Sequence, residues 1–136
     1  MPEDQPGTAA SNEVHQTILL VEDDADIGEF IAQALKDETQ YTILHVLDGL
    51  RALEAVASVK PDLFILDYQL PGMNGIELHD RLHEIKGYEN IPTLIISANV
   101  PSRKEMQQRK ITLLKKPFDL NDLYSAIEKL LAPDKS

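Results

Sequence analysis

Short apolar runs alternate with amphipathic stretches from residue 17 to residue 131. Five apolar runs predict strands: TILLV at 17–21, YTILHV at 41–46, LFIL at 63–66, TLIIS at 93–97 and ITLL at 111–114. Apolar residues recur at helical spacing over 26–36, 50–57, 78–85 and 120–131, and the polar stretch 102–110 predicts a short, weakly packed helix. Several adjacent apolar residues in a strand indicate burial on both faces, as in a parallel sheet.

The helical spacing groups apolar side chains into one stripe on each of the first two helices. They are Ile27, Phe30, Ile31, Ala34 and Leu35 in the first helix, and Leu50, Leu53, Val56 and Ala57 in the second. Asp119 is expected to cap the start of the last helix, and Asp24 and Asp26 lie where they cap the first or stabilise its dipole.

Five strands that alternate with five helical stretches predict a single α/β domain built on a doubly wound parallel sheet, because each parallel crossover must travel back along the sheet. A chain of 136 residues fits one such domain. We expect a flexible N-terminal arm over 1–15, a folded domain over 16–132 and a short tail over 133–136.

Charge and composition narrow the function. The chain carries 23 acidic and 13 basic residues, a formal charge of −10, which disfavours direct binding of nucleic acid and favours cations or basic partners. It has no cysteine, so thiolate metal sites and thiol nucleophiles are excluded. Its longest apolar runs, four residues, are far too short for a membrane helix or a signal-peptide core, so we expect a cytoplasmic protein without membrane contact.

Polar residues at the ends of the predicted strands suggest the chemistry, because ligands of open parallel sheets bind at the carboxyl ends of the strands. These residues are Glu22, Asp23 and Asp24 after the first strand, Asp67 after the third, Ser97 at the end of the fourth and Lys116 after the fifth. Clustered carboxylates without sulfur ligands suit Mg²⁺. Beside such an ion, the carboxylate of Asp67 can accept a phosphoryl group, with Lys116 and Ser97 stabilising the transferred oxygens.

Four segments at these positions resemble the signature segments of the response-regulator receiver domain of two-component signalling. They are ILLVEDD at 18–24, LFILDYQLPGMNG at 63–75, TLIISA at 93–98 and KKPF at 115–118. The resemblance implies a flavodoxin-like sheet whose strands, numbered along the chain, lie in the order 2-1-3-4-5. It also implies a cis bond between Lys116 and Pro117.

The same resemblance assigns roles to residues. Glu22 and Asp23 match the acidic pair that holds Mg²⁺, Asp67 the phosphoacceptor, and Gln69 the position whose backbone carbonyl reaches the metal. Ser97 matches the switch hydroxyl and Lys116 the lysine that contacts the phosphoryl group. Two features depart from the family. Leu113 stands where an aromatic switch residue is common, and the segment between Ser97 and Lys116 is about one helical turn short.

Few residues follow the last predicted helix, so we expect either a stand-alone receiver or a piece of a longer protein. The resemblance implies that the domain is not an enzyme beyond its own phosphorylation and dephosphorylation. The implied phosphoryl donor is a sensor histidine kinase or a phosphotransfer protein. The resemblance also implies an unidentified downstream target that binds at the face formed by the fourth helix, the fifth strand and the fifth helix. A dimer that forms on phosphorylation is one way in which such a domain responds.

Alternatives remain at this point. An aspartyl-phosphate phosphohydrolase uses similar groups, although Gln69 occupies the position where such enzymes carry a second Asp. A receiver-like interaction module that accepts no phosphate is the other alternative. His79 and His83 lie four residues apart, a weak likeness to a zinc-protease motif, and we expect them to be structural or solvated.

Overall fold

The computed structural model describes residues 16–99 and 101–132, so the predicted arm over 1–15 and tail over 133–136 lie outside the described residues. Its strands are β2 (Thr17–Val21), β3 (Thr42–Val46), β4 (Leu63–Asp67), β5 (Thr93–Ser97) and β6 (Thr112–Lys115). They form one five-stranded sheet in the order β3-β2-β4-β5-β6, and every pairing is parallel. The predicted fold and the strand order 2-1-3-4-5 are confirmed.

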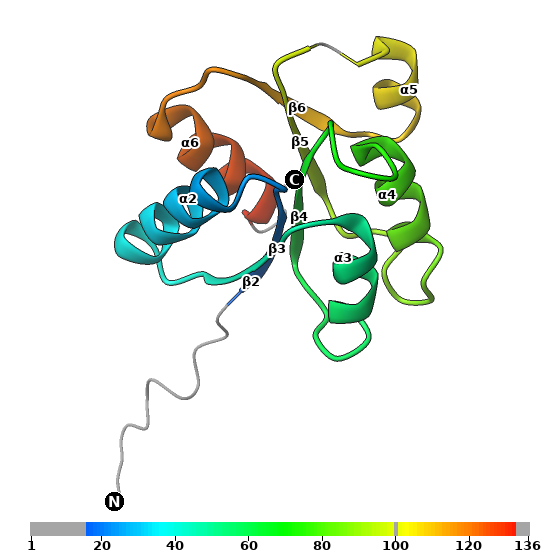
Figure 1. Ribbon diagram of the computed structural model, residues 1–136, viewed down its shortest axis with the longest axis horizontal. Coiled ribbons are helices and arrows are strands. Elements are labelled where there is room, and N and C mark those ends of the chain that lie inside the picture. The colour runs from blue at the N-terminus through cyan, green and yellow to red at the C-terminus, as the bar shows by residue number, and fades with distance from the viewer. Residues whose placement is uncertain (1–15, 100, 133–136) are drawn as a thin grey trace, which may run out of the picture.

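Five helices cover the two faces of this sheet. They are α2 (Ala25–Glu38), α3 (Gly49–Ala55), α4 (Gly75–His83), α5 (Arg103–Gln108) and α6 (Leu120–Leu131). Helices α2 and α6 lie on one face, and α3, α4 and α5 lie on the other (Figure 1). As predicted, α5 is short, with six residues. Within the described ranges, none of these helices combines the length and the apolar character needed to cross a membrane.

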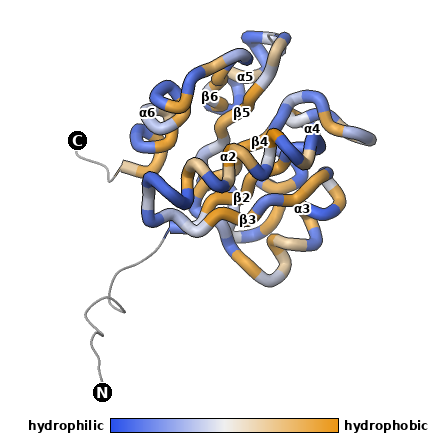
Figure 2. The backbone as a smooth tube through the Cα atoms, turned by 60° about the vertical axis from the view of Figure 1, so that its left-hand side comes forward, coloured by the Kyte–Doolittle hydropathy of each residue, from blue (hydrophilic) through white to orange (hydrophobic). Residues whose placement is uncertain are grey.

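The central strands supply both halves of the core. In β2, Ile18 and Leu20 belong to the cluster under α2 and α6, whereas Leu19 and Val21 belong to the cluster under α3 and α4. Figure 2 shows hydrophobic colour along the strands and mixed colour along the helices, as expected for helices that bury only one face.

Side-chain caps begin the helices at the predicted points. Asp24 caps α2 by accepting hydrogen bonds from the backbone N–H groups of Asp26 and Ile27, and Asp119 caps α6. The capping prediction is therefore confirmed for Asp24 and Asp119. Asn74 and Glu77 form a reciprocal capping box at the start of α4, directly after the turn that follows β4.

The apolar stripes of the first two helices are only partly buried. Phe30 is 62% exposed, Leu50 is 65% exposed, and Ile27 and Ala57 are also exposed. Helix α2 instead buries Gly28, Ile31, Ala32 and Leu35. The small residues Gly28 and Ala32 let α2 approach the sheet, so the buried stripe is rotated toward them and Ile27 and Phe30 lie outside it.

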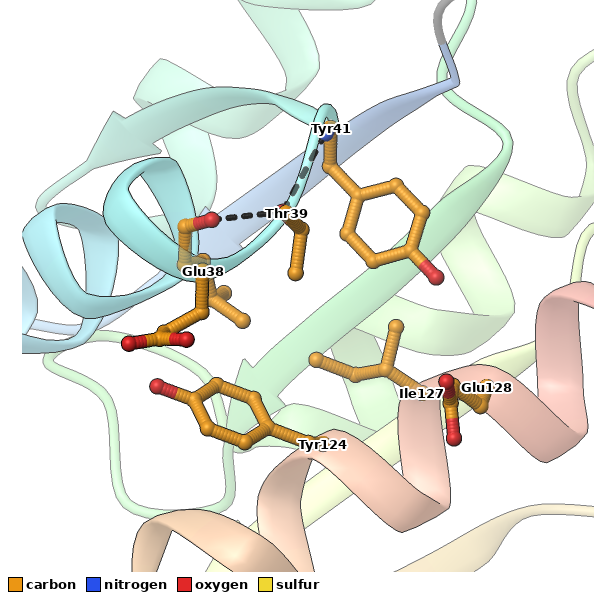
Figure 3. Close-up of a pocket in the computed structure, with 7 residues that line it drawn as sticks. Glu38, Thr39, Tyr41, Tyr124, Ile127 and Glu128 are labelled. Atoms are coloured by element: carbon orange, nitrogen blue, oxygen red, sulfur yellow. Dashed lines mark hydrogen bonds between the residues drawn. The ribbon is translucent and has the colours of Figure 1, made fainter.

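The far end of α2 meets α6 around a small cavity of about 170 Å³ (Figure 3). Tyr41 and Tyr124 line it, and the hydroxyl of Tyr124 donates to the carbonyl of Ala34 at 3.4 Å. Burial, and then the carboxylate of Glu128, raise the pKa of Tyr41. This cavity follows the C-terminal end of α2, so it lies at the opposite end of the helix from its cap Asp24.

Candidate functional site at the strand ends

The carboxyl ends of β2 and β4 bring two acidic residues together. The register pairs Val21 with Leu66, so Glu22 and Asp67 follow as neighbours at the same edge of the sheet. Their side chains are buried, while Asp23 is exposed beside them. Carboxylate oxygens of these three residues all lie within 4.8 Å of one another. The predicted acidic cluster therefore exists, and Asp24 is used separately as the cap of α2.

Lys116 enters this cluster from the loop after β6. Its Nζ lies 3.2 Å from Oδ2 of Asp67 and 3.4 Å from Oε1 of Glu22. The chain is held there by a hydrogen bond from the backbone N–H of Lys116 to the carbonyl of Ser97, and the Lys116–Pro117 bond is cis, as predicted. The three charged side chains form one compact group.

Burial and neighbouring charges both shift pKa values in the pocket, with burial as the main cause for Glu22. Burial raises the pKa of Glu22 to about 7, and the neighbouring Asp67 adds to this, while a hydrogen bond from the backbone of Asp24 opposes it. Burial by itself would lower the pKa of Lys116, but the carboxylates of Asp67 and Glu22 outweigh it and raise that pKa. Carboxylates crowded in this way are stabilised by a further cation, and oxygen ligands of this kind suit Mg²⁺.

Ser97 and Gln69 reach the same edge of the sheet. Because Asp67 pairs with Ile96 across β4 and β5, Ser97 is the next residue at that edge. Its buried hydroxyl donates to the backbone carbonyl of Asn99 and accepts from the N–H of Asn99. The N–H of Gln69 donates to Oδ1 of Asp67 at 3.1 Å. The role of the Gln69 carbonyl as a metal ligand stays a prediction.

An apolar groove of about 600 Å³ lies beside this pocket. Ile27 and Phe30 of α2 line one part, and Pro117, Phe118 and Leu120 line another, with Lys116 at the boundary with the acidic cluster. The exposed side chains of Ile27 and Phe30 thus belong to a surface that adjoins the acidic cluster. Helical spacing predicted that these two residues lie on the apolar stripe of the first helix, but it did not predict that they line a groove.

His45 contacts the site without having been predicted to do so. Its Nε2 lies 2.9 Å from the backbone carbonyl oxygen of Glu22. The sequence offered two signals. One is a histidine inside a largely apolar strand, and the other is Gly28 in α2, the helix that packs on this histidine. Neither signal specifies a contact, because the contact depends on how α2 and β3 meet.

The two helix histidines are structural, as expected. Nδ1 of His79 donates to Asp80 at 2.9 Å, and burial lowers the pKa of His79. The two ring nitrogens of His83 each lie 2.7 Å from a backbone carbonyl oxygen, those of His79 and Ile91. Since both nitrogens of His83 already face acceptors, the pair is not arranged as a zinc site.

Comparison with known proteins was consistent with this geometry. Residues 18–128 match the model of the response regulator receiver domain. Sporulation initiation phosphotransferase F of Bacillus subtilis is 32% identical over 123 residues, which cover 87% of this chain and 95% of that protein. Hybrid signal transduction histidine kinase D of Dictyostelium discoideum is 28% identical over 88% of this chain, but the chain spans only 8% of that protein.

A solved structure shows the same architecture. The chemotaxis protein CheY4 of Vibrio cholerae superposes with a TM-score of 0.80 at 25% sequence identity, over 87% of this chain and all of that one. The structural similarity therefore extends over most of the domain.

Proposed function

The chain belongs to the response regulator receiver domain family of two-component systems, and we propose that it is a signalling switch phosphorylated on Asp67. The observation that carries the proposal is the position of the buried Asp67 carboxylate, with Oδ2 at 3.2 Å from the Lys116 ammonium and within a cluster of carboxylates able to hold a metal ion. We further propose that the domain acts in the cytoplasm.

The proposed reaction transfers a phosphoryl group from a phosphohistidine to Asp67. A carboxylate oxygen of Asp67 forms the new P–O bond, the P–N bond breaks, and the imidazole of the donor leaves with the electron pair and takes up a proton. Glu22, Asp23, Asp67 and the backbone carbonyl of Gln69 would hold Mg²⁺, which supplies neutralisation of charge on the phosphoryl oxygens.

The chain's own cation and hydroxyl complete the proposed site. Lys116 already contacts Asp67 and stays close enough to contact the transferred oxygens. Ser97 must exchange its hydrogen bond with the Asn99 carbonyl for one to the phosphoryl group. This exchange would move the 97–99 segment that leads toward α5, which links phosphorylation to the face formed by α5, β6 and α6.

The apolar groove is the proposed docking surface for the donor, a sensor histidine kinase or a phosphotransfer protein. Ile27 and Phe30 present exposed apolar area beside the Lys116 side of the pocket, where a donor must bind to bring its phosphohistidine to Asp67. The downstream partner, or a second copy in a phosphorylation-dependent dimer, is proposed to bind the α5, β6 and α6 face. Leu113, partly buried in β6, cannot act there as an aromatic switch.

Intact-mass measurement after incubation with acetyl phosphate and Mg²⁺ tests the phosphorylation. We expect wild type and the control Asp37→Ala, which changes an exposed acid of α2, to gain one phosphoryl group, and Asp67→Ala to gain none. Chelation of Mg²⁺ should prevent the gain. If wild type gains no phosphoryl group from either a small donor or a cognate kinase, the proposal is wrong.

Turnover assays separate the switch from an enzyme. We expect no rapid multiple turnover of small phosphate esters, because Gln69 lacks the acid and base function that a phosphohydrolase needs two residues after its nucleophile. Such turnover, abolished by Asp67→Ala, would identify a phosphohydrolase instead.

A further inference from the structure

The backbone between Glu22 and Asp23 is held by the edge strand β3. The N–H of Glu22 donates to the carbonyl of Val46 at 3.1 Å, and the carbonyl oxygen of Glu22 lies 2.9 Å from Nε2 of His45. A carbonyl oxygen can only accept, so Nε2 of His45 carries the proton and donates it. Adjacent residues of β3 therefore bind both polar groups of the Glu22 backbone, one through the main chain and one through a side chain.

The side-chain bond occurs where the strand ladder ends. In a continuing parallel ladder, the carbonyl of Glu22 would accept from the N–H two residues after Val46. That residue, Asp48, is instead the N-cap of α3, and β3 has already ended at Val46. The imidazole of His45 thus provides a donor for a carbonyl at the point where the regular backbone pairing stops.

Gly28 leaves the space that this imidazole occupies. A Cβ atom added at Gly28 would lie 2.1 Å from both Cε1 and Nε2 of His45, far inside contact distance. Gly28 is buried in α2, directly above the ring. The glycine and the histidine are therefore matched: the ring reaches the Glu22 carbonyl only because position 28 has no side chain.

We propose that His45 is a positioning residue for the Mg²⁺ site, an inference that rests on the proposed function of the acidic pocket. The peptide unit that His45 holds joins the two adjacent acidic residues of the cluster, Glu22 and Asp23. Fixing its carbonyl fixes the rotation of that peptide, and with it the directions in which the two carboxylates leave the backbone. Partners that orient metal ligands in this way commonly contribute about 10-fold to 100-fold in affinity.

Two substitutions of His45 distinguish positioning from packing. Gln carries its amide nitrogen at the ε position and can donate to the Glu22 carbonyl in place of Nε2, whereas Asn carries it at the δ position and cannot reach. Isothermal titration calorimetry of the full chain with Mg²⁺ gives the Kd, and thermal unfolding in EDTA measures stability without the ion. We expect His45→Asn to raise the Kd about tenfold and His45→Gln to stay near wild type.

Gly28→Ala tests the same contact with His45 intact. The added methyl group must displace the ring, so we expect the Kd for Mg²⁺ to rise as it does in His45→Asn. The control Ala34→Gly removes a methyl group from α2 six residues after Gly28, where the backbone carbonyl faces Tyr124 of α6, and should leave the Kd unchanged.

Three outcomes would contradict the inference. They are a wild-type Kd in His45→Asn, a Kd in His45→Gln as weak as in His45→Asn, and a Kd in Gly28→Ala that stays at the wild-type value while the protein remains folded. Failure of the proposed function has a different signature, because wild type itself would then show no Mg²⁺ binding and no phosphorylation, and the inference about His45 would fail with it.

Discussion

The Nζ atom of Lys116 lies 3.2 Å from Oδ2 of Asp67, a contact between the end of β4 and the loop after β6. The same ammonium group is 3.4 Å from the carboxylate of Glu22. One cation therefore serves two buried carboxylates, and with Asp23 beside them the cluster carries an excess of negative charge once Glu22 is ionised. This imbalance favours the binding of a further cation, and we expect Lys116 to matter for stability as well as for the proposed phosphoryl transfer.

Removing the ammonium group should destabilise the metal-free protein. In Lys116→Met the carboxylates of Asp67 and Glu22 lose their shared cation, so we expect the free energy of unfolding at pH 8 to fall by about 1–3 kcal/mol. Urea denaturation in EDTA measures the loss, and saturating Mg²⁺ should reduce it. Lys115→Met, at an exposed neighbouring position, should change stability by less than about 0.5 kcal/mol. Equal losses in the two variants would contradict the assignment.

The raised pKa of Glu22 predicts a pH-dependent stability. Its pKa is 4.5 when unperturbed and about 7 in the folded protein, so between these values the unfolded chain has released the proton and the folded protein has kept it. The free energy of unfolding should therefore fall as the pH rises from about 4.5 to about 7. Glu22→Gln removes this dependence and should stabilise the metal-free protein at pH 8 by about 1–3 kcal/mol, with little effect at pH 4.

Urea denaturation of wild type and Glu22→Gln in EDTA, at both pH values, checks this expectation. Glu29→Gln, a substitution of an exposed acid in α2, is the matched control and should have nearly the same effect at the two pH values. If the gain from Glu22→Gln is the same at pH 4 and pH 8, the buried carboxylate is not its cause.

The positions of the site residues were predictable because they depend on local features of the sequence. Asp67 and Ser97 end wholly buried strands, and parallel strands place their carboxyl ends at one edge of the sheet. Lys116 follows the last strand and is separated from Asp67 by 49 residues, yet the strand order alone brings both to that edge. The strand order itself was predicted from the resemblance of the four segments to those of the receiver family.

Contacts that depend on the rotation of a helix about its axis were not predictable. Phe30 is exposed and Ala32 is buried, although helical spacing allows either residue to lie on the apolar stripe of α2. The close approach permitted by Gly28 determines that Ala32 is the buried one. The hydrogen bond of His45 and the ion pair of Asp80 with Arg109 likewise join elements whose relative placement follows from packing of the whole domain.

The Asp80 and Arg109 pair should couple α4 to the end of the short α5. Arg109 donates from Nε and Nη2 to the two carboxylate oxygens of Asp80, at 2.7 and 2.9 Å, and this hydrogen bonding lowers the pKa of Asp80. Because the pair is partly exposed, solvent limits the coupling energy to about 1 kcal/mol in a double-mutant cycle of Asp80→Asn and Arg109→Met. The coupling energy should disappear as the pH falls through the lowered pKa of Asp80. As a control, Arg103→Met combined with Asp80→Asn should show no coupling energy.

Lys110 should be a site where glycine stabilises the protein. Its φ of 58° lies in the left-handed region, directly after α5, where the N–H of Ile111 bonds to the carbonyl of Met106 and closes the end of the helix. A residue with a side chain loses about 1 kcal/mol of stability in this conformation, and glycine avoids that loss. Glycine also makes the unfolded chain more flexible, which offsets part of the gain. We expect Lys110→Gly to raise the free energy of unfolding by about 0.5 kcal/mol in urea denaturation. Lys110→Ala removes the same charge but keeps the Cβ atom, so a gain of equal size in that variant would show that charge, and not backbone conformation, is responsible.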